Sequence, residues 1–266
     1  MNTFLEAILL GFVEGITEFL PISSTGHLIL VGELLGFQGP PGRVFEVVIQ
    51  LGAILAVCAI YWQRLWDCAR NVFRDKSAQR FWLALLIAFL PAAFLGFLLH
   101  AMIKTFLFNP WTVSFALILG GVAIIAIERM AKHVQFTSIE NVPFPRIAAV
   151  GFCQAIAMFP GVSRSGATIM GGLLLGFDRK TAAEFSFLLA IPTMLGASVL
   201  DLWKNRAALS ADDASLLGVG FAAAFVAAFL TVKLAIGFVS RVGFQPFGYY
   251  RIIVGFIMLL FLYTRP

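Results

Sequence analysis

Two short polar segments interrupt long apolar stretches of this chain, and both are rich in residues suited to binding phosphate. The first runs Pro-Ile-Ser-Ser-Thr-Gly-His from position 21, and the second runs Pro-Gly-Val-Ser-Arg-Ser-Gly from position 160. Glu14 and Glu18 precede the first segment, and their spacing of four places both carboxylates on one face of a helix. Two carboxylates buried together repel each other, so a proton or a cation must compensate them. A divalent cation with oxygen ligands, Mg²⁺ or Ca²⁺, is the natural partner.

The first polar segment combines hydroxyl groups, backbone N–H groups freed by Gly26 and one imidazole. A helix that begins after this segment directs its positive end back at it, which suits a phosphate group. His27 is a candidate general acid, general base or nucleophile near neutral pH. Ser24, a hydroxyl close to a carboxylate, has the pattern of an activated nucleophile.

The second polar segment places Arg164 between two serines. A guanidinium that is always charged needs a carboxylate partner or an anionic ligand at membrane depth, and its planar fork favours phosphate. A structural ion pair with Glu14 or Glu18 is the alternative. We expect Arg164 and the following residues to bind phosphate oxygens: Ser23, Thr25, Gly26, Ser163, Ser165 and Thr168.

Three more polar residues lie inside apolar runs, namely Glu46, Gln50 and Glu184. They are candidates either to support the site residues from behind or to form hydrogen bonds between helices.

The elements that must position these residues belong to a membrane protein. Hydrophobic residues make up 60% of the 266 positions and charged residues 12%, and the mean hydropathy is +0.93. A soluble domain carries about 25% charged residues. The 19 basic residues outnumber the 14 acidic ones, but they lie mainly in short loops, which argues against nucleic-acid binding. Six runs are long enough to span a bilayer: 44–62, 81–100, 111–128, 181–200, 216–236 and 249–264.

The two interrupted segments are copies of each other. Shifting the chain by 140 residues aligns 11–37 with 151–177, and 12 of these 27 positions are then identical. We therefore predict a single integral membrane domain with internal repeats at about 1–133 and 140–266. Each repeat is all-α and contains one re-entrant helical hairpin and three transmembrane helices. Since three is odd, the second repeat must be inverted relative to the first.

Positive charge orients this arrangement. If the basic loop 63–80 faces the cytoplasm, that side collects 13 of the 19 basic residues. Both termini then lie outside, the first hairpin enters from outside and the second enters from the cytoplasm. Their tips meet near the middle of the bilayer, where the repeats have diverged: Glu14 aligns with Gln154, and Ser24 aligns with Arg164.

On these motifs the chain resembles the bacterial undecaprenyl pyrophosphate phosphatase family, also known for bacitracin resistance. The acidic ExxxE that leads into PxSSTGH stands at 14–27, and PGxSRSGxT stands at 160–168. The resemblance implies hydrolysis of undecaprenyl diphosphate to undecaprenyl phosphate, which recycles the carrier lipid for peptidoglycan synthesis. It also implies dependence on a divalent cation, an inner-membrane location and a site open to the outer face.

Combining the motifs with this resemblance gives a mechanism as a hypothesis. Glu14 and Glu18 hold the cation, Ser24 attacks, and Glu18 or His27 transfers the proton. We favour Ser24 as the nucleophile, while His27 and water remain open. A transporter or flippase of a phosphorylated polyprenyl lipid is the alternative function, because such architectures also occur in secondary transporters. The sequence leaves the oligomeric state open, a homodimer included.

Overall fold

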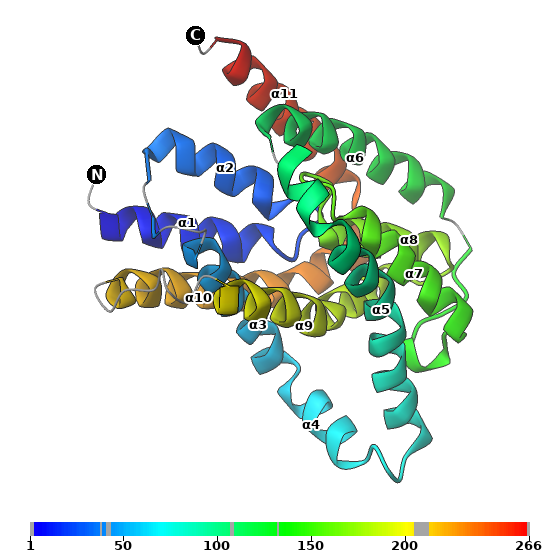
Figure 1. The fold of residues 1–266 in the computed structure, drawn as a ribbon. Helices are drawn as coiled ribbons and strands as arrows, with labels where there is room; N and C mark the ends of the chain where they lie inside the picture. Colours follow the sequence, from blue (N-terminus) through cyan, green and yellow to red (C-terminus); the bar gives the residue numbers. More distant parts are fainter. Residues whose placement is uncertain are drawn as a thin grey trace.

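The computed structural model describes residues 3–37, 39–40, 44–106, 109–131, 133–204 and 213–264, and helices dominate this part of the chain (Figure 1). One 3₁₀ turn, Ile139–Asn141, lies between α6 and α7. The helices are α1 (Thr3–Thr17), α2 (Ser24–Leu35), α3 (Val44–Ile60), α4 (Trp62–Arg70), α5 (Lys76–Phe106), α6 (Pro110–Met130), α7 (Phe144–Ile156), α8 (Arg164–Leu174), α9 (Arg179–Lys204), α10 (Ala214–Val242) and α11 (Gln245–Thr264).

The long helices have the length and composition of membrane spans. Within the described residues, α5, α6, α9, α10 and α11 each qualify alone, and α3 qualifies together with α4, from which it is bent by 69°. Large apolar side chains point outward from these helices; Leu119 is 68% exposed and Leu234 is 72% exposed. Such surface needs lipid rather than water around it. The protein is therefore a multi-pass membrane protein with an all-α fold, as predicted.

Both interrupted segments form a pair of short helices, as the sequence predicts. Helix α1 packs against α2, and α7 packs against α8. The turn of each pair points toward the centre of the molecule, where the two turns meet (Figure 1). There the Ser165 hydroxyl donates a hydrogen bond of 2.8 Å to the carbonyl of Leu20. The inverted orientation of the repeats in a membrane stays a prediction.

The two halves contain their helices in the same order. Each starts with a hairpin of two short helices and continues with three long ones, α3, α5 and α6 or α9, α10 and α11, while α4 occurs in the first half alone. Helix α1 packs on α10, and α7 packs on α5. The first helix of each half thus lies on the second long helix of the other half, which interlocks the halves around the two turns.

The serine before each inner helix has an unusual backbone conformation. Ser23 has φ 68° and Ser163 has φ 78°, and they are the non-glycine residues with positive φ in the described ranges. Their positions differ by the repeat offset of 140. Such a conformation costs about 1–3 kcal/mol and persists only where the surroundings impose it. The same strained turn therefore begins α2 and α8, and it leaves the first N–H groups of both helices facing the turns.

Glycines allow α1 and α7 to approach their partner helices closely. A Cβ atom added to Gly15 of α1 would lie 2.5 Å from the carbonyl oxygen of Ala224 in α10. A Cβ added to Gly151 of α7 would lie 2.6 Å from the carbonyl oxygen of Ala88 in α5. Small residues at such contacts are the usual means of helix packing in membranes.

Replacing Gly15 with leucine is expected to destabilise the protein by about 1–3 kcal/mol, because the new side chain must push α1 away from α10. Gly237→Ala in α10 is the matched control, since an added Cβ there meets nothing within 4 Å. It should leave stability unchanged or raise it by about 0.5–1 kcal/mol. Thermal unfolding in detergent measures both, and equal melting temperatures for the two variants would contradict the close contact.

Candidate functional site

The site begins at the end of α1, where Glu18 contacts a residue from each inner helix. The Ser24 hydroxyl, at the start of α2, donates a hydrogen bond of 2.5 Å to Glu18 Oε2. Arg164 Nη2, at the start of α8, lies 3.3 Å from Glu18 Oε1. The Glu18 N–H still donates to the Glu14 carbonyl, so Glu14 and Glu18 keep the helical spacing predicted for them. The three predicted residues Glu18, Ser24 and Arg164 therefore meet at one carboxylate.

Arg164 is also held from its other side. Its Nη1 donates to the carbonyl oxygen of Ser186 in α9 at 2.6 Å, and the Ser186 hydroxyl lies 3.3 Å away. Thr168 donates to that hydroxyl at 2.6 Å. The guanidinium carbon lies 5.7 Å from the centre of the Phe19 ring. The structure thus contains the ion pair with Glu18 that is the alternative to phosphate binding, and the Arg164 side chain is 13% exposed.

Glu14 adds a second buried carboxylate next to Glu18. Glu14 is 1% exposed, and its Oε2 has no hydrogen-bond partner in the described part of the chain. The negative charges of Glu18 and, more weakly, Glu46 act on it. A buried carboxylate with a free oxygen and acidic neighbours is an arrangement that a cation stabilises.

The donor atoms of Glu14 and Glu18 suit Mg²⁺ better than Ca²⁺. No cluster of three or more His, Cys, Asp or Glu side chains that would enclose a metal occurs among the described residues. Mg²⁺ is usually held by one or two carboxylates, with water and phosphate oxygens completing its shell, whereas Ca²⁺ takes six to eight oxygen ligands. The pair of Glu14 and Glu18 fits the first pattern.

His27 is engaged at both ring nitrogens. Its Nδ1 lies 2.8 Å from the carbonyl oxygen of Ser23, which can only accept, so Nδ1 carries the hydrogen. Its Nε2 lies 2.8 Å from the Tyr250 hydroxyl, which donates to it when the imidazole is neutral, and the centres of the two stacked rings are 5.5 Å apart. His27 holds the strained Ser23 turn, and neither nitrogen is free in this arrangement.

Removing the Tyr250 hydroxyl tests this pairing. Tyr250→Phe keeps the stacked ring but leaves Nε2 without its donor, so the free energy of unfolding should fall by about 0.5–1.5 kcal/mol. Tyr249→Phe is the control, because within the described residues the Tyr249 hydroxyl contacts only the exposed Arg129, at 3.5 Å. Its effect should stay within about 0.5 kcal/mol. Denaturant unfolding in detergent compares them, and equal losses would argue against the His27 contact.

The remaining predicted hydroxyls divide into two groups. Ser163 accepts from the N–H of Gly166 at 3.1 Å and contacts Ser165 at 3.0 Å, both within the second turn, whereas Ser165 donates to Leu20 of the first turn. In contrast, the Thr25 hydroxyl is partly exposed and makes no hydrogen bond within the described residues. Gly26 packs against α6, where an added Cβ would lie 3.2 Å from Leu117.

The supporting candidates have different surroundings. Glu46 is exposed, and its negative charge acts on Glu14. Gln50 accepts a hydrogen bond of 3.5 Å from Ser198, a link between α3 and α9. Glu184 lies 3.6 Å from Arg64 of α4 and so belongs to an ion-pair cluster at the end of α9 rather than to the turns.

That cluster fixes the segment between α6 and α7. Arg64 Nη2 donates to Glu140 Oε1 at 2.6 Å, and Arg80 Nε donates to the Glu140 carbonyl at 2.7 Å. Burial alone would raise the pKa of Glu140, but hydrogen bonds from Ser138, from its own backbone and from Arg64 lower the pKa below its usual value. Glu184 is therefore part of a structural tie between helix ends.

Two residues near the turns are not predicted from the sequence, Tyr250 and Arg251 of α11. Arg251 is counted among the cytoplasmic basic residues in the charge argument, yet it is 1% exposed and contacts both turns. An arginine at the start of an apolar run is usually one that reaches water at the membrane surface. Its position two residues into the expected span 249–264 is the one signal that separates it from the loop residues.

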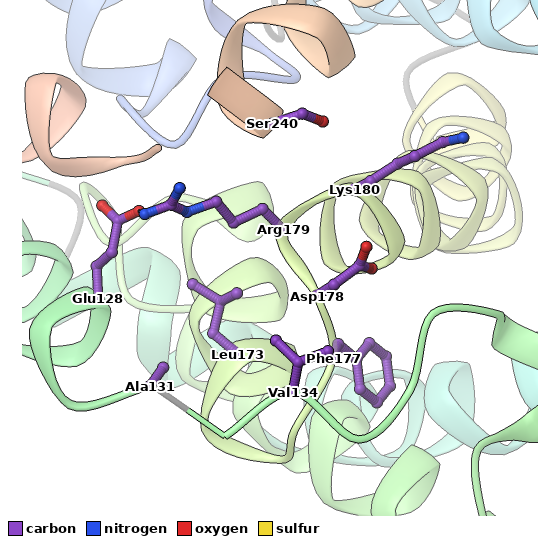
Figure 2. A pocket seen from close by; sticks show the side chains of 9 residues that line it. All are labelled: Glu128, Ala131, Val134, Leu173, Phe177, Asp178, Arg179, Lys180 and Ser240. Carbon is purple, nitrogen blue, oxygen red and sulfur yellow. The ribbon is translucent and has the colours of Figure 1, made fainter. Parts of the chain in front are cut away.

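A cavity of about 290 Å³ is lined by residues of α6, α8, α9 and α10 and of the segments beside them (Figure 2). Figure 2 shows Arg179 of α9 reaching toward Glu128 of α6, and the two are 2.8 Å apart. Glu128 also accepts a hydrogen bond of 2.7 Å from the N–H of Phe244. None of the predicted site residues lines this cavity, so the candidate site is the contact between the turns.

Comparisons with known proteins identify the family of this chain. Residues 7–257 match the model of the family described as bacitracin resistance protein BacA. "Undecaprenyl-diphosphatase 2" of Paramagnetospirillum magneticum is 54% identical over 98% of this chain and all of its own. "Undecaprenyl-diphosphatase" of Parvibaculum lavamentivorans is 54% identical over 97% of this chain and 96% of its own. "Undecaprenyl-diphosphatase 1" of Agrobacterium fabrum is 51% identical over 97% of each. The chain belongs to the bacitracin resistance protein BacA family.

Proposed function

We propose that this chain hydrolyses undecaprenyl diphosphate to undecaprenyl phosphate and inorganic phosphate. The reaction recycles the carrier lipid for peptidoglycan synthesis and confers bacitracin resistance. One observation carries the proposal: Ser24 and Arg164, from two different hairpins, meet on the two oxygens of Glu18. The names of three relatives at 51–54% identity point to the same substrate.

The terminal phosphate binds between the two turns. The positive ends of α2 and α8 face it, and Arg164 supplies a planar pair of donors. Without substrate, Arg164 forms an ion pair with Glu18. When the substrate binds, the phosphate replaces Glu18 as the partner of part of the guanidinium. Thr25 is the hydroxyl best placed to bind phosphate, because it has no partner within the described residues. The isoprenoid tail remains in lipid.

Ser24 attacks the terminal phosphorus, and Glu18 takes the hydroxyl proton. The hydrogen bond of 2.5 Å between them already points the proton at the carboxylate. As the new Ser24 O–P bond forms, the anhydride P–O bond breaks and its electron pair leaves on undecaprenyl phosphate. A water molecule then attacks the phosphoserine and the Ser24 O–P bond breaks. Ser24 takes back its proton from Glu18, and inorganic phosphate departs with the oxygen and hydrogens of the water. His27 positions Ser23 and does not take part in proton transfer, because both its nitrogens are engaged.

Glu14 and Glu18 would hold a divalent cation, and the donor set favours Mg²⁺. When bound, it neutralises phosphate charge and stabilises the charge that develops as the anhydride breaks. The free Oε2 of Glu14 supports this assignment.

The proposed location is the bacterial inner membrane, with the site open to the outer face and both termini outside. The distribution of basic residues between the loops supports this orientation. The first two and last two residues lie outside the described part of the chain.

Phosphate release from undecaprenyl diphosphate by the purified protein tests the function. Activity should require Mg²⁺ or Ca²⁺ and disappear with EDTA, and it should return when the cation is restored. Tight binding of the lipid without release under any cation would reject the phosphatase and favour the lipid transporter that the repeats also suggest.

A further inference from the structure

Arg251 of α11 lies buried between the two turns of the candidate site and has no acidic partner. It is 1% exposed, and no carboxylate in the described residues forms an ion pair with it. Instead, its guanidinium donates hydrogen bonds to backbone carbonyl oxygens. These belong to Pro21 (3.2 Å), Ala116 (3.0 Å), Leu117 (3.3 Å), Gly161 (2.8 Å) and Val162 (2.8 Å).

The five carbonyls come from three segments that are far apart in the sequence. Pro21 belongs to the first turn, Gly161 and Val162 belong to the second turn, and the other two belong to α6. The same Nη1 bridges Pro21 and Val162, so a single nitrogen joins the two turns. These carbonyls lie two or three residues before Ser24 and Arg164. Displacing either turn at this point therefore displaces a side chain that meets Glu18.

The surroundings are shaped for a guanidinium. Gly120 of α6 lies so close to Nη2 that an added Cβ would overlap it, and a Cβ on Gly166 would lie 3.3 Å from Nη1. A lysine ammonium has three N–H donors on one atom and cannot reach carbonyls on both sides of the planar fork. The positive charge of Arg251 is balanced by carbonyl dipoles alone, so it also favours an anion at the turns.

We propose that Arg251 is a positioning residue for hydrolysis: it fixes the two turns relative to each other so that Ser24, Glu18 and Arg164 meet. The proposal rests on the proposed function for its kinetic part. Its structural part, that Arg251 holds both turns together, stands without it.

The test compares Arg251→Lys and Arg251→Gln with the wild type in detergent, with Arg241→Lys at the exposed end of α10 as the control. Two readouts are needed: phosphate release from undecaprenyl diphosphate, and hydrogen–deuterium exchange of peptides that cover the two turns. In Arg251→Lys, kcat should fall at least about 100-fold with KM changed less than about threefold, because misplacement near 1 Å has that effect. Exchange should rise in both turns and stay unchanged in α9 and α10. Arg251→Gln should show a loss at least as large, and Arg241→Lys should show neither change.

Several outcomes would overturn the proposal. Full activity and normal exchange in Arg251→Lys would show that a positive charge alone is enough at this position and that the planar guanidinium group is not needed. Faster exchange through the whole chain in both Arg251 variants would show that Arg251 contributes to general stability. The variant Gly120→Ala then distinguishes positioning from stability, because it displaces the guanidinium without removing it. Gly120→Ala should raise exchange in the turns alone, and if it does not, the positioning role is wrong. A wild-type protein that releases no phosphate rejects the proposed function, while the exchange data still decide the role of Arg251.

Discussion

Replacing Glu18 with glutamine is expected to lower kcat for phosphate release by about 10³–10⁴-fold. The change removes the carboxylate that accepts the Ser24 proton, and base catalysis by a positioned side chain contributes about 10²–10⁴-fold. It also removes the charge partner of Arg164, which lies 3.3 Å away, and one proposed ligand of the cation. Single-turnover phosphate release measures the effect on chemistry apart from product release.

Glu46→Gln is the matched control for this prediction. Glu46 is exposed and acts on Glu14 through its charge, so the activity of the Glu46→Gln variant should fall less than about tenfold. Similar losses in the two variants would show that the acidic cluster acts by total charge, and that Glu18 has no special role as a base.

Replacing Arg164 with lysine is expected to lower kcat/KM by about 10²–10³-fold, although the positive charge is kept. A single ammonium cannot donate to the Ser186 carbonyl, Glu18 and a phosphate from the directions that the planar guanidinium uses. Removing one electrostatic donor to a developing charge has an effect of this size. The loss should appear mainly in kcat, because the interaction strengthens as the anhydride breaks.

A second ion pair provides the control for Arg164. Arg179 and Glu128 lie 2.8 Å apart, and both line the cavity, which none of the predicted site residues lines (Figure 2). Arg179→Lys should change activity by less than about threefold. If both lysine variants lose activity equally, general weakening of the helix bundle explains the Arg164 result better than contact with substrate does.

Most helices could be predicted closely because each depends on local pattern, but α4 (Trp62–Arg70) occupies part of the stretch 63–80, for which the sequence pattern predicts a loop. Apolar runs of about 20 residues indicate spanning helices, and the breaks at positions 21 and 160 indicate where the short helices turn. The offset of 140 residues also pairs Ser23 with Ser163, and the structure gives both serines the same strained backbone conformation. The sequence pattern alone does not show that strain, because serine is common before any helix.

The site could be predicted in part, because its members come from motifs with recognisable chemistry. The spacing of Glu14 and Glu18 and the choice of arginine between two serines indicate a shared anionic site. The pairing of Ser24 with one oxygen of Glu18 and of Arg164 with the other depends on how the two hairpins pack, which no periodicity specifies.

Tyr250 and Arg251 could not be predicted, because their partners in the first turn lie more than 200 residues earlier in the sequence. Tyr250 meets His27 across 223 positions, and Arg251 meets Pro21 across 230 positions. A tyrosine and an arginine at the start of the last apolar run fit the membrane interface equally well. Their contacts follow from α11 packing on α6 beside both turns, and they include the Tyr250 hydroxyl that contacts Nε2 of His27.

The most direct measurement of the account compares phosphate release from undecaprenyl diphosphate by the wild type, Ser24→Ala and Ser23→Ala. The two serines are neighbours of equal size, but only the Ser24 hydroxyl contacts Glu18 within the described residues. The account predicts cation-dependent release by the wild type, a loss of at least about 100-fold in Ser24→Ala and less than about tenfold in Ser23→Ala. Equal activities of the two variants, or no release by the wild type, would contradict it.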